Sequence, residues 1–279
     1  MILVADSGST KTSWVDVESG NKIVTEGLNP HFTTDEQFLA ACKKVLETCH
    51  STSLQQVLFY GAGCGSKVQR ERVKIILSEA FGVDDVQVET DMLGACRAVC
   101  GDKASLVGIL GTGSNARYYD GERIKCQPTS TGYVLGDKGS ANHVGRVLLN
   151  DYLTHRMPAA LRRMFHETYH LSDAKLMDAV YHQPHPNRFL ASLAPFAVQH
   201  QEEEYCGGVI WETLCDWYFD PLLPLRRRAR YWEGTLHVVG GYAKAIEPTL
   251  RRYFEDDGLQ VGTVVADPTE GLLRYHKTV

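Results

Sequence analysis

The amino-acid sequence predicts an α/β fold of two related domains, the second of which carries a large helical insertion. Short apolar segments rich in β-branched residues alternate with segments of helical periodicity, which is the pattern of an α/β protein. An apolar strand, a polar turn containing glycine and a β-hairpin follow one another twice, first from residue 2 and again from residue 106. The 279 residues are enough for two domains with a ligand-binding cleft between them.

The first domain is expected to span residues 1–101 and to begin with a strand and a hairpin. Its strands are predicted from short β-rich runs bounded by polar turn residues, and its helices from apolar residues at helical spacing. The predicted strands are 2–5, 13–17, 22–26, 57–60 and 86–89, and the predicted helices are 34–49, 67–81 and 91–100.

The second domain, residues 102–279, is expected to repeat this beginning. An Asp-Gly pair at Asp120 and Gly121 predicts the turn of its hairpin. The stretch 141–231 is predicted to be mostly helical, with prolines that separate its helices. The expected elements are strands at 106–110, 116–119, 123–125 and 236–239, the helical insertion at 141–231, and a helix from Gly241 to about 255.

The composition indicates a globular protein of the cytoplasm. With 43% hydrophobic and 23% charged residues, the chain is neither disordered nor collagen-like nor a coiled coil. A net charge of −5 argues against nucleic-acid binding, and the basic run Arg226, Arg227, Arg228 and Arg230 is interpreted as a solvated helix face. No segment is apolar enough to span a bilayer, and the start lacks the basic region of a signal peptide. We therefore expect no membrane partner and no nucleic-acid partner.

The eight cysteines are spread along the chain, and none of them forms a Cys-x-x-Cys pair. In a long chain without an export signal this pattern does not predict a disulfide framework. Cys96 and Cys100 lie four residues apart on a predicted helix beside apolar residues. We interpret them as small core residues rather than as metal or cluster ligands.

The first turn has the composition of a phosphate-binding loop. It places Asp6 at the end of a strand and follows it with Ser7, Gly8, Ser9, Thr10, Lys11 and Thr12. Gly8 allows backbone N–H groups to approach phosphate oxygens, and Asp6 can hold Mg²⁺ through water. The turn is not a P-loop, because the chain contains no Gly-Lys dipeptide.

A second glycine turn follows the strand 106–110, with the sequence Gly111, Thr112, Gly113, Ser114, Asn115 and Ala116. It fits the Gly-x-Gly-x-x-Ala fingerprint of a dinucleotide-binding site, but that fingerprint requires a helix directly afterwards. Here a strand and a hairpin turn are predicted instead. We interpret it as a second phosphate-binding turn.

Residues 166–170 match the His-Glu-x-x-His signature of zinc proteases. Both histidines are predicted to share a helix face with Arg162 and Arg163, and this cationic surface is unfavourable for a dication. No third ligand stands at a familiar spacing. The chain also lacks a Gly-x-Ser-x-Gly nucleophile elbow, so neither class of hydrolase is predicted.

The paired turns, with a third glycine turn at Gly240 and Gly241, resemble the sugar kinase, actin and Hsp70 superfamily. Within it the chain is similar to the BadF/BadG/BcrA/BcrD ATPase family and, more closely, to the N-acetylglucosamine kinases. The resemblance covers nearly the whole chain and implies two RNase H-like (actin-like ATPase) domains with an interdomain cleft. The matching segments are 29–31, 60–64, 91–95, 109–115, 132–140 and 268–272.

The resemblance also assigns roles to residues. It implies that Asp91 is the catalytic base, although Asp is also a favoured N-cap of a helix. The implied ATP-binding residues are Asp6, Gly8, Ser9, Thr10, Lys11, Thr12, Gly111, Thr112, Gly113, Gly240, Gly241 and Ala243, with Mg²⁺ held by Asp6 through water. The implied sugar-binding residues are Asn29, Ser114, Asn115, Gly132, Tyr133 and Asp137. An Asx turn is the alternative interpretation of Asn29, which precedes Pro30.

The chain departs from the family pattern at three positions. Lys138 stands where a glutamate is usual, Tyr133 where tryptophan is frequent and Gly241 where serine is frequent. The first two departures concern the sugar side and leave the identity of the sugar open.

The resulting hypothesis is an ATP- and Mg²⁺-dependent kinase that phosphorylates the 6-hydroxyl of an amino sugar, with N-acetylglucosamine as the leading substrate. Two alternatives remain at this point. One is an ATPase that activates a partner reductase, as other members of the wider family do with a cysteine-held iron–sulfur cluster. The other is a sugar or nucleotide sensor without catalysis. The sequence leaves a homodimer open.

Overall fold

The computed structural model describes residues 1–49, 54–126, 130–228 and 235–277. Its contacts divide the chain into two compact units. Unit 1 consists of Met1–Ala104, Asp120–Ile124 and Asp267–Val279, and unit 2 of Ser105–Tyr119 and Lys125–Ala266. The N-terminal part of unit 1 ends close to the predicted boundary, but unit 1 also takes in the C-terminal segment, which was placed in the second domain.

Unit 1 contains a mixed sheet with the strand order β3-β2-β1-β4-β5. The hairpin strands pair antiparallel, whereas β1 pairs parallel with β4, and β4 with β5. The strands are β1 (Ile2–Ser7), β2 (Lys11–Asp16), β3 (Lys22–Glu26), β4 (Gln56–Gly61) and β5 (Asp85–Thr90). Its helices are α1 (Asp35–Thr48), α2 (Lys67–Phe81), α3 (Asp91–Cys100) and α14 (Thr269–Lys277).

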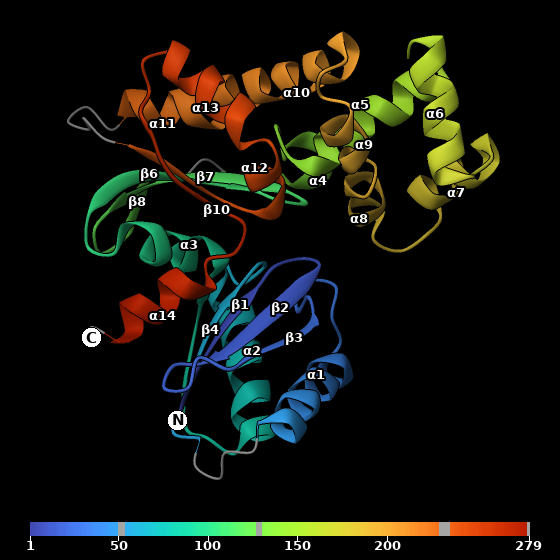
Figure 1. The fold of residues 1–279 in the computed structure, drawn as a ribbon. Coiled ribbons are helices and arrows are strands. Elements are labelled where there is room, and N and C mark those ends of the chain that lie inside the picture. The colour runs from blue at the N-terminus through green and yellow to red at the C-terminus, as the bar shows by residue number, and fades with distance from the viewer. Residues whose placement is uncertain (50–53, 127–129, 229–234, 278–279) are drawn as a thin grey trace. The chain divides into compact units, whose positions relative to one another are not determined.

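Successive side chains of the unit 1 strands enter different cores, because they point to opposite faces of the sheet. Leu3 and Ala5 of β1 belong to a core that includes Phe38 of α1 and Val73 of α2. Val4, which lies between them, belongs to another core that includes Leu272 of α14. Helix α14 also packs against α3 (Figure 1). This packing explains why the C-terminal segment groups with unit 1.

Unit 2 repeats the strand arrangement of unit 1. Its sheet has the order β10-β9-β6-β7-β8, in which each strand occupies the place of its counterpart in unit 1. The strands are β6 (Ala104–Leu110), β7 (Ser114–Asp120), β8 (Ile124–Cys126), β9 (Leu236–Val239) and β10 (Val261–Val265). The predicted duplication is therefore confirmed, and with it the α/β fold of two related domains.

The predicted helical insertion of unit 2 is also present. It consists of α4 (Gly132–Leu135), α5 (Ala141–Leu153), α6 (Ala159–Tyr169), α7 (Asp173–Tyr181), α8 (Pro186–Ala191), α9 (Ala194–Gln199), α10 (Glu204–Trp217), a π-helical turn (Tyr218–Leu222) and α11 (Leu223–Arg228). The helix predicted after Gly241 to about 255 is present, but it is interrupted at Ile246 and so forms α12 (Gly241–Ala245) and α13 (Glu247–Asp256). Pro248 at the start of α13 accounts for the break, since proline lacks the N–H that a continuous helix needs.

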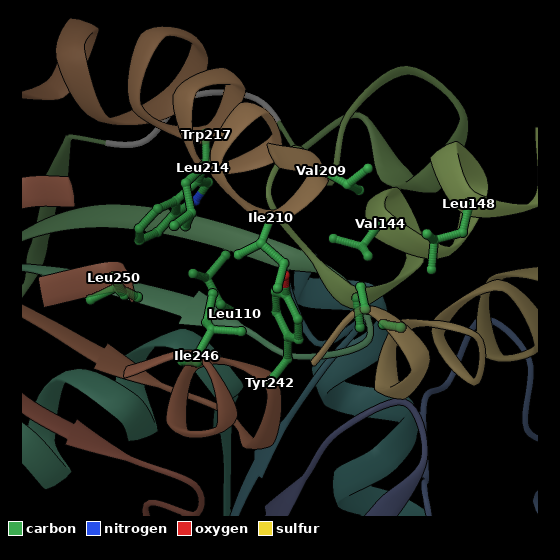
Figure 2. Packing of buried hydrophobic residues seen from close by; sticks show 14 of the residues in the cluster. Leu110, Val144, Leu148, Val209, Ile210, Leu214, Trp217, Tyr242, Ile246 and Leu250 are labelled. Carbon is green, nitrogen blue, oxygen red and sulfur yellow. The ribbon is translucent and has the colours of Figure 1, made fainter. Parts of the chain in front are cut away.

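The core of unit 2 lies between its sheet and helices. Figure 2 shows Ile210, Leu214 and Trp217 of α10, with Leu110 and with Tyr242 and Ile246 of the segment after β9. Trp217 is fully buried, and a side chain at Gly108 of β6 would collide with its ring. Close packing at Gly108 thus brings α10 directly onto the strand that carries the second glycine turn.

Candidate active site

The first turn of unit 1 is held by backbone contacts. The N–H of Gly8 donates to the carbonyl of Lys11 at 3.0 Å, and the N–H of Gly27 donates to the carbonyl of Thr10 at 3.0 Å. A Cβ atom at Gly27 would lie 2.5 Å from the carbonyl oxygen of Gly8 and 2.6 Å from that of Ser9. Only glycine fits at position 27, so the β3 side of the sheet supports the backbone of this turn.

The hydroxyl groups of the turn differ in their surroundings. Thr12 is buried, its Oγ1 lies 2.8 Å from Oγ of Ser7, and it donates to the carbonyl of Glu26 at 2.8 Å. Ser9 is half-buried and Thr10 is exposed. Of the predicted phosphate-binding hydroxyls, that of Thr12 is therefore engaged in the sheet, whereas Ser9 and Thr10 are accessible.

Asp6, the second-last residue of β1, has a carboxyl group without a partner in the part of the chain that the structure describes. It accepts no hydrogen bond and forms no ion pair among the described residues. Burial raises the pKa of Asp6 to about 8, and the negative charges of Asp267 and Asp91 raise it further, while Lys11 and Lys22 act in the opposite direction. A carboxylate that lacks a partner in such surroundings is stabilised by a cation.

The donors around Asp6 suit Mg²⁺, which prefers carboxylate oxygen and keeps several of its waters. Within the described parts of the chain, no three His, Cys, Asp or Glu side chains group closely enough to hold a metal ion. Asp6 would thus be a single carboxylate ligand, and water and phosphate oxygens would complete the coordination, as in the sequence-based expectation. The residues present fit the ion.

Asp91 is the first residue of α3 and is half-buried. The N-cap is Thr90, whose hydroxyl accepts from the N–H of Leu93 at 3.2 Å. One oxygen of Asp91 accepts from the N–H of Met92 at 2.8 Å. Thr90 is therefore the N-cap residue, and Asp91 satisfies a second N–H group of the first turn.

Asn29 adopts the Asx turn that was its alternative interpretation. Its Oδ1 accepts from the N–H of His31 at 3.0 Å, and its carbonyl accepts from the N–H groups of Phe32 and Thr33. Gly63, after β4, has a φ of +83° and leaves room for no side chain beside the Asn29 amide. The Asn29 Nδ2 group has no partner among the described residues, so the amide keeps its donors for a ligand.

The second turn, in unit 2, is closed by the N–H of Gly111, which donates to the carbonyl of Gly113 at 2.9 Å. The first residues of α5 donate hydrogen bonds to the other carbonyl groups of this turn. The N–H of Ala141 donates to Gly111, and both the N–H and the Nδ2 of Asn142 donate to Thr112. The turn is thereby fixed to the N-terminus of a helix.

Asp137 lies next to this turn in an unusual backbone conformation, with a φ of 51°. Its Oδ1 accepts from the N–H of Ser114 at 3.2 Å and its Oδ2 from Nδ2 of Asn142 at 3.2 Å. Burial raises the pKa of Asp137, while these hydrogen bonds and Arg146 lower it. A carboxylate offers about four lone pairs, so Asp137 can still accept hydrogen bonds from sugar hydroxyls.

Three predicted sugar-binding residues, Ser114, Asn115 and Asp137, come together in unit 2. The hydroxyl of Ser114 donates to the carbonyl of Lys138 at 2.6 Å, and Oδ1 of Asn115 accepts from the N–H of Ala116 at 3.0 Å. Gly132 and Tyr133 begin the short helix α4, which Arg146 of α5 anchors through the carbonyl of Tyr133 at 3.0 Å. Asn29 and Asp91 lie in unit 1.

The third glycine turn supports the end of β6. Gly240 has a φ of +138°, and a Cβ atom there would collide with the carbonyl of Leu110. Its N–H donates to the carbonyl of Val265 at 2.8 Å. Gly241 is exposed at the start of α12, and Ala243 is buried. Gly241 and not Ala243 is accessible to a ligand.

The sequence motifs that were set aside find structural roles. His166 lies on α6 and is hydrogen-bonded to Tyr152 at 3.0 Å, but His170 lies beyond the helix end with a φ of 49°. The expectation that the two histidines share a helix face is therefore wrong. Arg226 forms an ion pair with Asp257 at 3.1 Å, whereas the side chain of Arg228 and the whole of Arg230 lie outside the described residues. Cys96 and Cys100 are buried on α3, as predicted.

Solved structures give the family. A protein from Porphyromonas gingivalis described as a "putative N-acetylglucosamine kinase" is 35% identical, with a TM-score of 0.93, and the match covers 100% of this chain and 99% of that one. This chain belongs to the same N-acetylglucosamine kinase-like family. No protein-family model and no curated protein sequence matches it.

Two less similar solved structures share the fold. A second "putative N-acetylglucosamine kinase", from Chromobacterium violaceum, is 16% identical with a TM-score of 0.73, and the match covers 98% of each chain. A ROK family glucokinase from Streptomyces griseus, in complex with glucose and AMPPNP, is 16% identical with a TM-score of 0.56 and covers 99% of each. These likenesses show the fold, which is that of the actin-like ATPases.

Several residues beside the candidate site were not predicted from the sequence. Asn142 and Arg146 support the turn and α4 of unit 2, and Lys22 and Asp267 lie beside Asp6 in unit 1. A signal existed for Asp267, because Asp-Pro-Thr-Glu is a typical helix start. No local signal distinguishes Lys22 from other surface lysines. Among the described residues, no helix has the length and apolarity needed to cross a membrane.

Proposed function

We propose that this chain is an ATP-dependent sugar kinase that phosphorylates the 6-hydroxyl of an amino sugar, with N-acetylglucosamine as the leading substrate. The observation that carries the proposal is the proximity of Asp6 and Asp91 in unit 1. Asp6 is the second-last residue of β1, Asp91 directly follows β5 of the same sheet, and Asp91 is close enough to raise the pKa of Asp6. One carboxylate thus has the features of a magnesium ligand and the other those of a base.

Phosphoryl transfer depends mainly on aligning the nucleophile and neutralising charge. Asp91 accepts the proton of the sugar 6-hydroxyl while that oxygen bonds to the γ-phosphorus, and the bond to the bridging oxygen of ADP breaks. A carboxylate is suited to this step because its oxygens can accept the hydrogen bond and then the proton of a hydroxyl group. Bound Mg²⁺ supplies charge neutralisation on the phosphates.

The other site residues keep the roles that the family resemblance gives them. The turn of unit 1 and that of unit 2 bind phosphates through backbone N–H groups, because glycines there allow a close approach. Asp137 and the Asn29 amide are the strongest candidates for the sugar hydroxyls, since Asp137 retains acceptor capacity and Asn29 Nδ2 retains its donors. The third turn, at Gly240 and Gly241, is proposed for adenosine.

ADP release with a panel of sugars tests the proposal. We expect N-acetylglucosamine to stimulate release more than glucosamine, N-acetylmuramic acid or glucose, and the product to carry its phosphate on the 6-oxygen. The Asp91→Asn variant should lower kcat by about 10²- to 10⁴-fold, which is the usual contribution of a general base. Asp84→Asn is the matched control, because Asp84 is an exposed residue just before β5. Release that no sugar stimulates, or an Asp91→Asn variant with normal kcat, would contradict the proposal.

A further inference from the structure

Asp267 connects the start of α14 to the first turn of unit 1. Its Oδ2 accepts from Nζ of Lys22 at 3.0 Å, from Nζ of Lys11 at 3.1 Å and from Oγ of Ser13 at 3.1 Å. Its Oδ1 accepts from the N–H of Thr269 at 2.9 Å and from the hydroxyl of the same residue. These donors hold the pKa of Asp267 far below its usual range, although burial acts in the opposite direction.

The strand register explains why these groups meet. Asp6 of β1 lies opposite Ser13 of β2, and Lys11 shares the face of Ser13 because it is two residues away. Lys22 of β3 pairs with Val15 on the same face. Helix α14 packs on this face of the sheet, and Asp267, two residues before the helix, therefore meets Lys11, Ser13 and Lys22.

The arrangement leaves more positive charge than one carboxylate needs. Three donors converge on Oδ2, which has two lone pairs, so they compete for it. Both ammonium groups lie near enough to Asp6 to lower its pKa, yet neither forms an ion pair with it among the described residues. The side chains of Lys11 and Lys22 are 56% and 40% exposed, whereas that of Asp267 is 19% exposed. The two lysines can therefore turn toward a ligand, and Asp267 cannot follow them.

We propose that Lys22 is a second phosphate-binding cation beside Lys11, and that Asp267 is the internal counter-ion that a nucleotide polyphosphate replaces. The inference rests on the proposed function, because it assumes that phosphates bind at the Asp6 turn. Without nucleotide, Asp267 pairs with both lysines and holds them at the turn. When the polyphosphate binds, its oxygens take over the lysine contacts, and Asp267 keeps its bonds to Thr269 and Ser13.

The test is calorimetric titration of the full chain with AMPPNP, ADP and adenosine, in the presence of Mg²⁺. Lys22→Met should weaken AMPPNP binding about tenfold, which is the loss expected for one charge-assisted hydrogen bond. Lys22→Arg should restore most of the binding, because it keeps the charge. Asp267→Asn should tighten AMPPNP binding about threefold, since it removes a competing negative charge while its amide oxygen still accepts from Thr269. Adenosine binding should not change in any variant.

Lys43→Met is the matched control, because Lys43 is an exposed lysine of α1 that pairs with Glu47. A Lys22→Met variant that binds AMPPNP as the control does would overturn the role of Lys22. An Asp267→Asn variant that binds AMPPNP more weakly would overturn the counter-ion role and make Asp267 an anchor of the lysines. Wild-type protein that binds neither nucleotide would refute the proposed function, and this inference with it. Thermal unfolding of each variant shows whether its fold is intact.

Discussion

Replacing Gly27 with alanine tests how tightly the first turn is built. The added Cβ atom would lie 2.5 Å from the Gly8 oxygen, 2.5 Å from the Ser9 carbonyl carbon and 2.6 Å from the Ser9 oxygen. All three are backbone atoms, so no flexible side chain can move aside and the turn itself must shift. Overpacking of this kind costs about 1–3 kcal/mol. Because the contacts are so short, we expect the free energy of unfolding to fall by about 3 kcal/mol, at the upper end of that range.

The displaced turn should also bind nucleotide poorly. We expect AMPPNP binding to weaken at least about tenfold, which corresponds to 1.4 kcal/mol of lost binding free energy. Urea denaturation measures the first effect and calorimetric titration the second. Gly65→Ala is the matched control, because a Cβ atom there meets nothing within 4 Å and Gly65 lacks a positive φ. If Gly27→Ala matches this control in both measurements, the backbone contact at Gly27 is not what holds the turn.

Three further predictions concern other parts of the site. Burial raises the pKa of Asp6 to about 8, so the folded protein keeps a proton that the unfolded chain loses near 3.8. With a metal chelator present, the free energy of unfolding of the wild type should therefore fall as pH rises from about 4 to 8. Asp6→Asn should remove this pH dependence, so that urea denaturation finds the variant more stable than the wild type at pH 8 but not at pH 4. Gly240→Ala should lower stability by about 2 kcal/mol, and Gly241→Ala, which has open space and no positive φ, should not, by thermal unfolding. Asn142→Ala removes a hydrogen-bond donor to Asp137 and should lower the free energy of unfolding by about 1–2 kcal/mol. In steady-state kinetics it should raise the KM for the sugar more than the KM for ATP.

The parts of the fold that the sequence predicts well are those with a strong local pattern. The apolar run of β1 followed by Gly8, and that of β6 followed by Gly111, mark both turns, because a strand that ends in glycine and hydroxyl residues has few other structures available. The amphipathic spacing of α1 identifies that helix in the same way. Its capping box, Thr34 with Gln37, is also visible in the sequence.

Features that depend on contacts between distant segments could not be predicted in this way. The sequence separation of Lys22 and Asp267 is 245 residues, and neither residue carries a local signal for the other. Strand β10 and helix α14 were not predicted, although Val261, Val264 and Val265 suggest a strand. The assignment of α14 to unit 1 follows from the burial of Leu272 against Val4, which only the folded sheet reveals.

The departure at Lys138 shows how main-chain and side-chain roles separate at a site. The carbonyl of Lys138 accepts from the hydroxyl of Ser114 at 2.6 Å, and any residue at this position can supply that carbonyl. The side chain instead faces Asp216 at 3.9 Å, a pair that is partly exposed and therefore weak. A glutamate here would carry the same charge as Asp216 of α10 and would be repelled by it. The presence of lysine in place of glutamate is therefore consistent with Asp216. The support that position 138 gives to Ser114 is thus independent of the departure, and a change in sugar preference would have to come from the side chain alone.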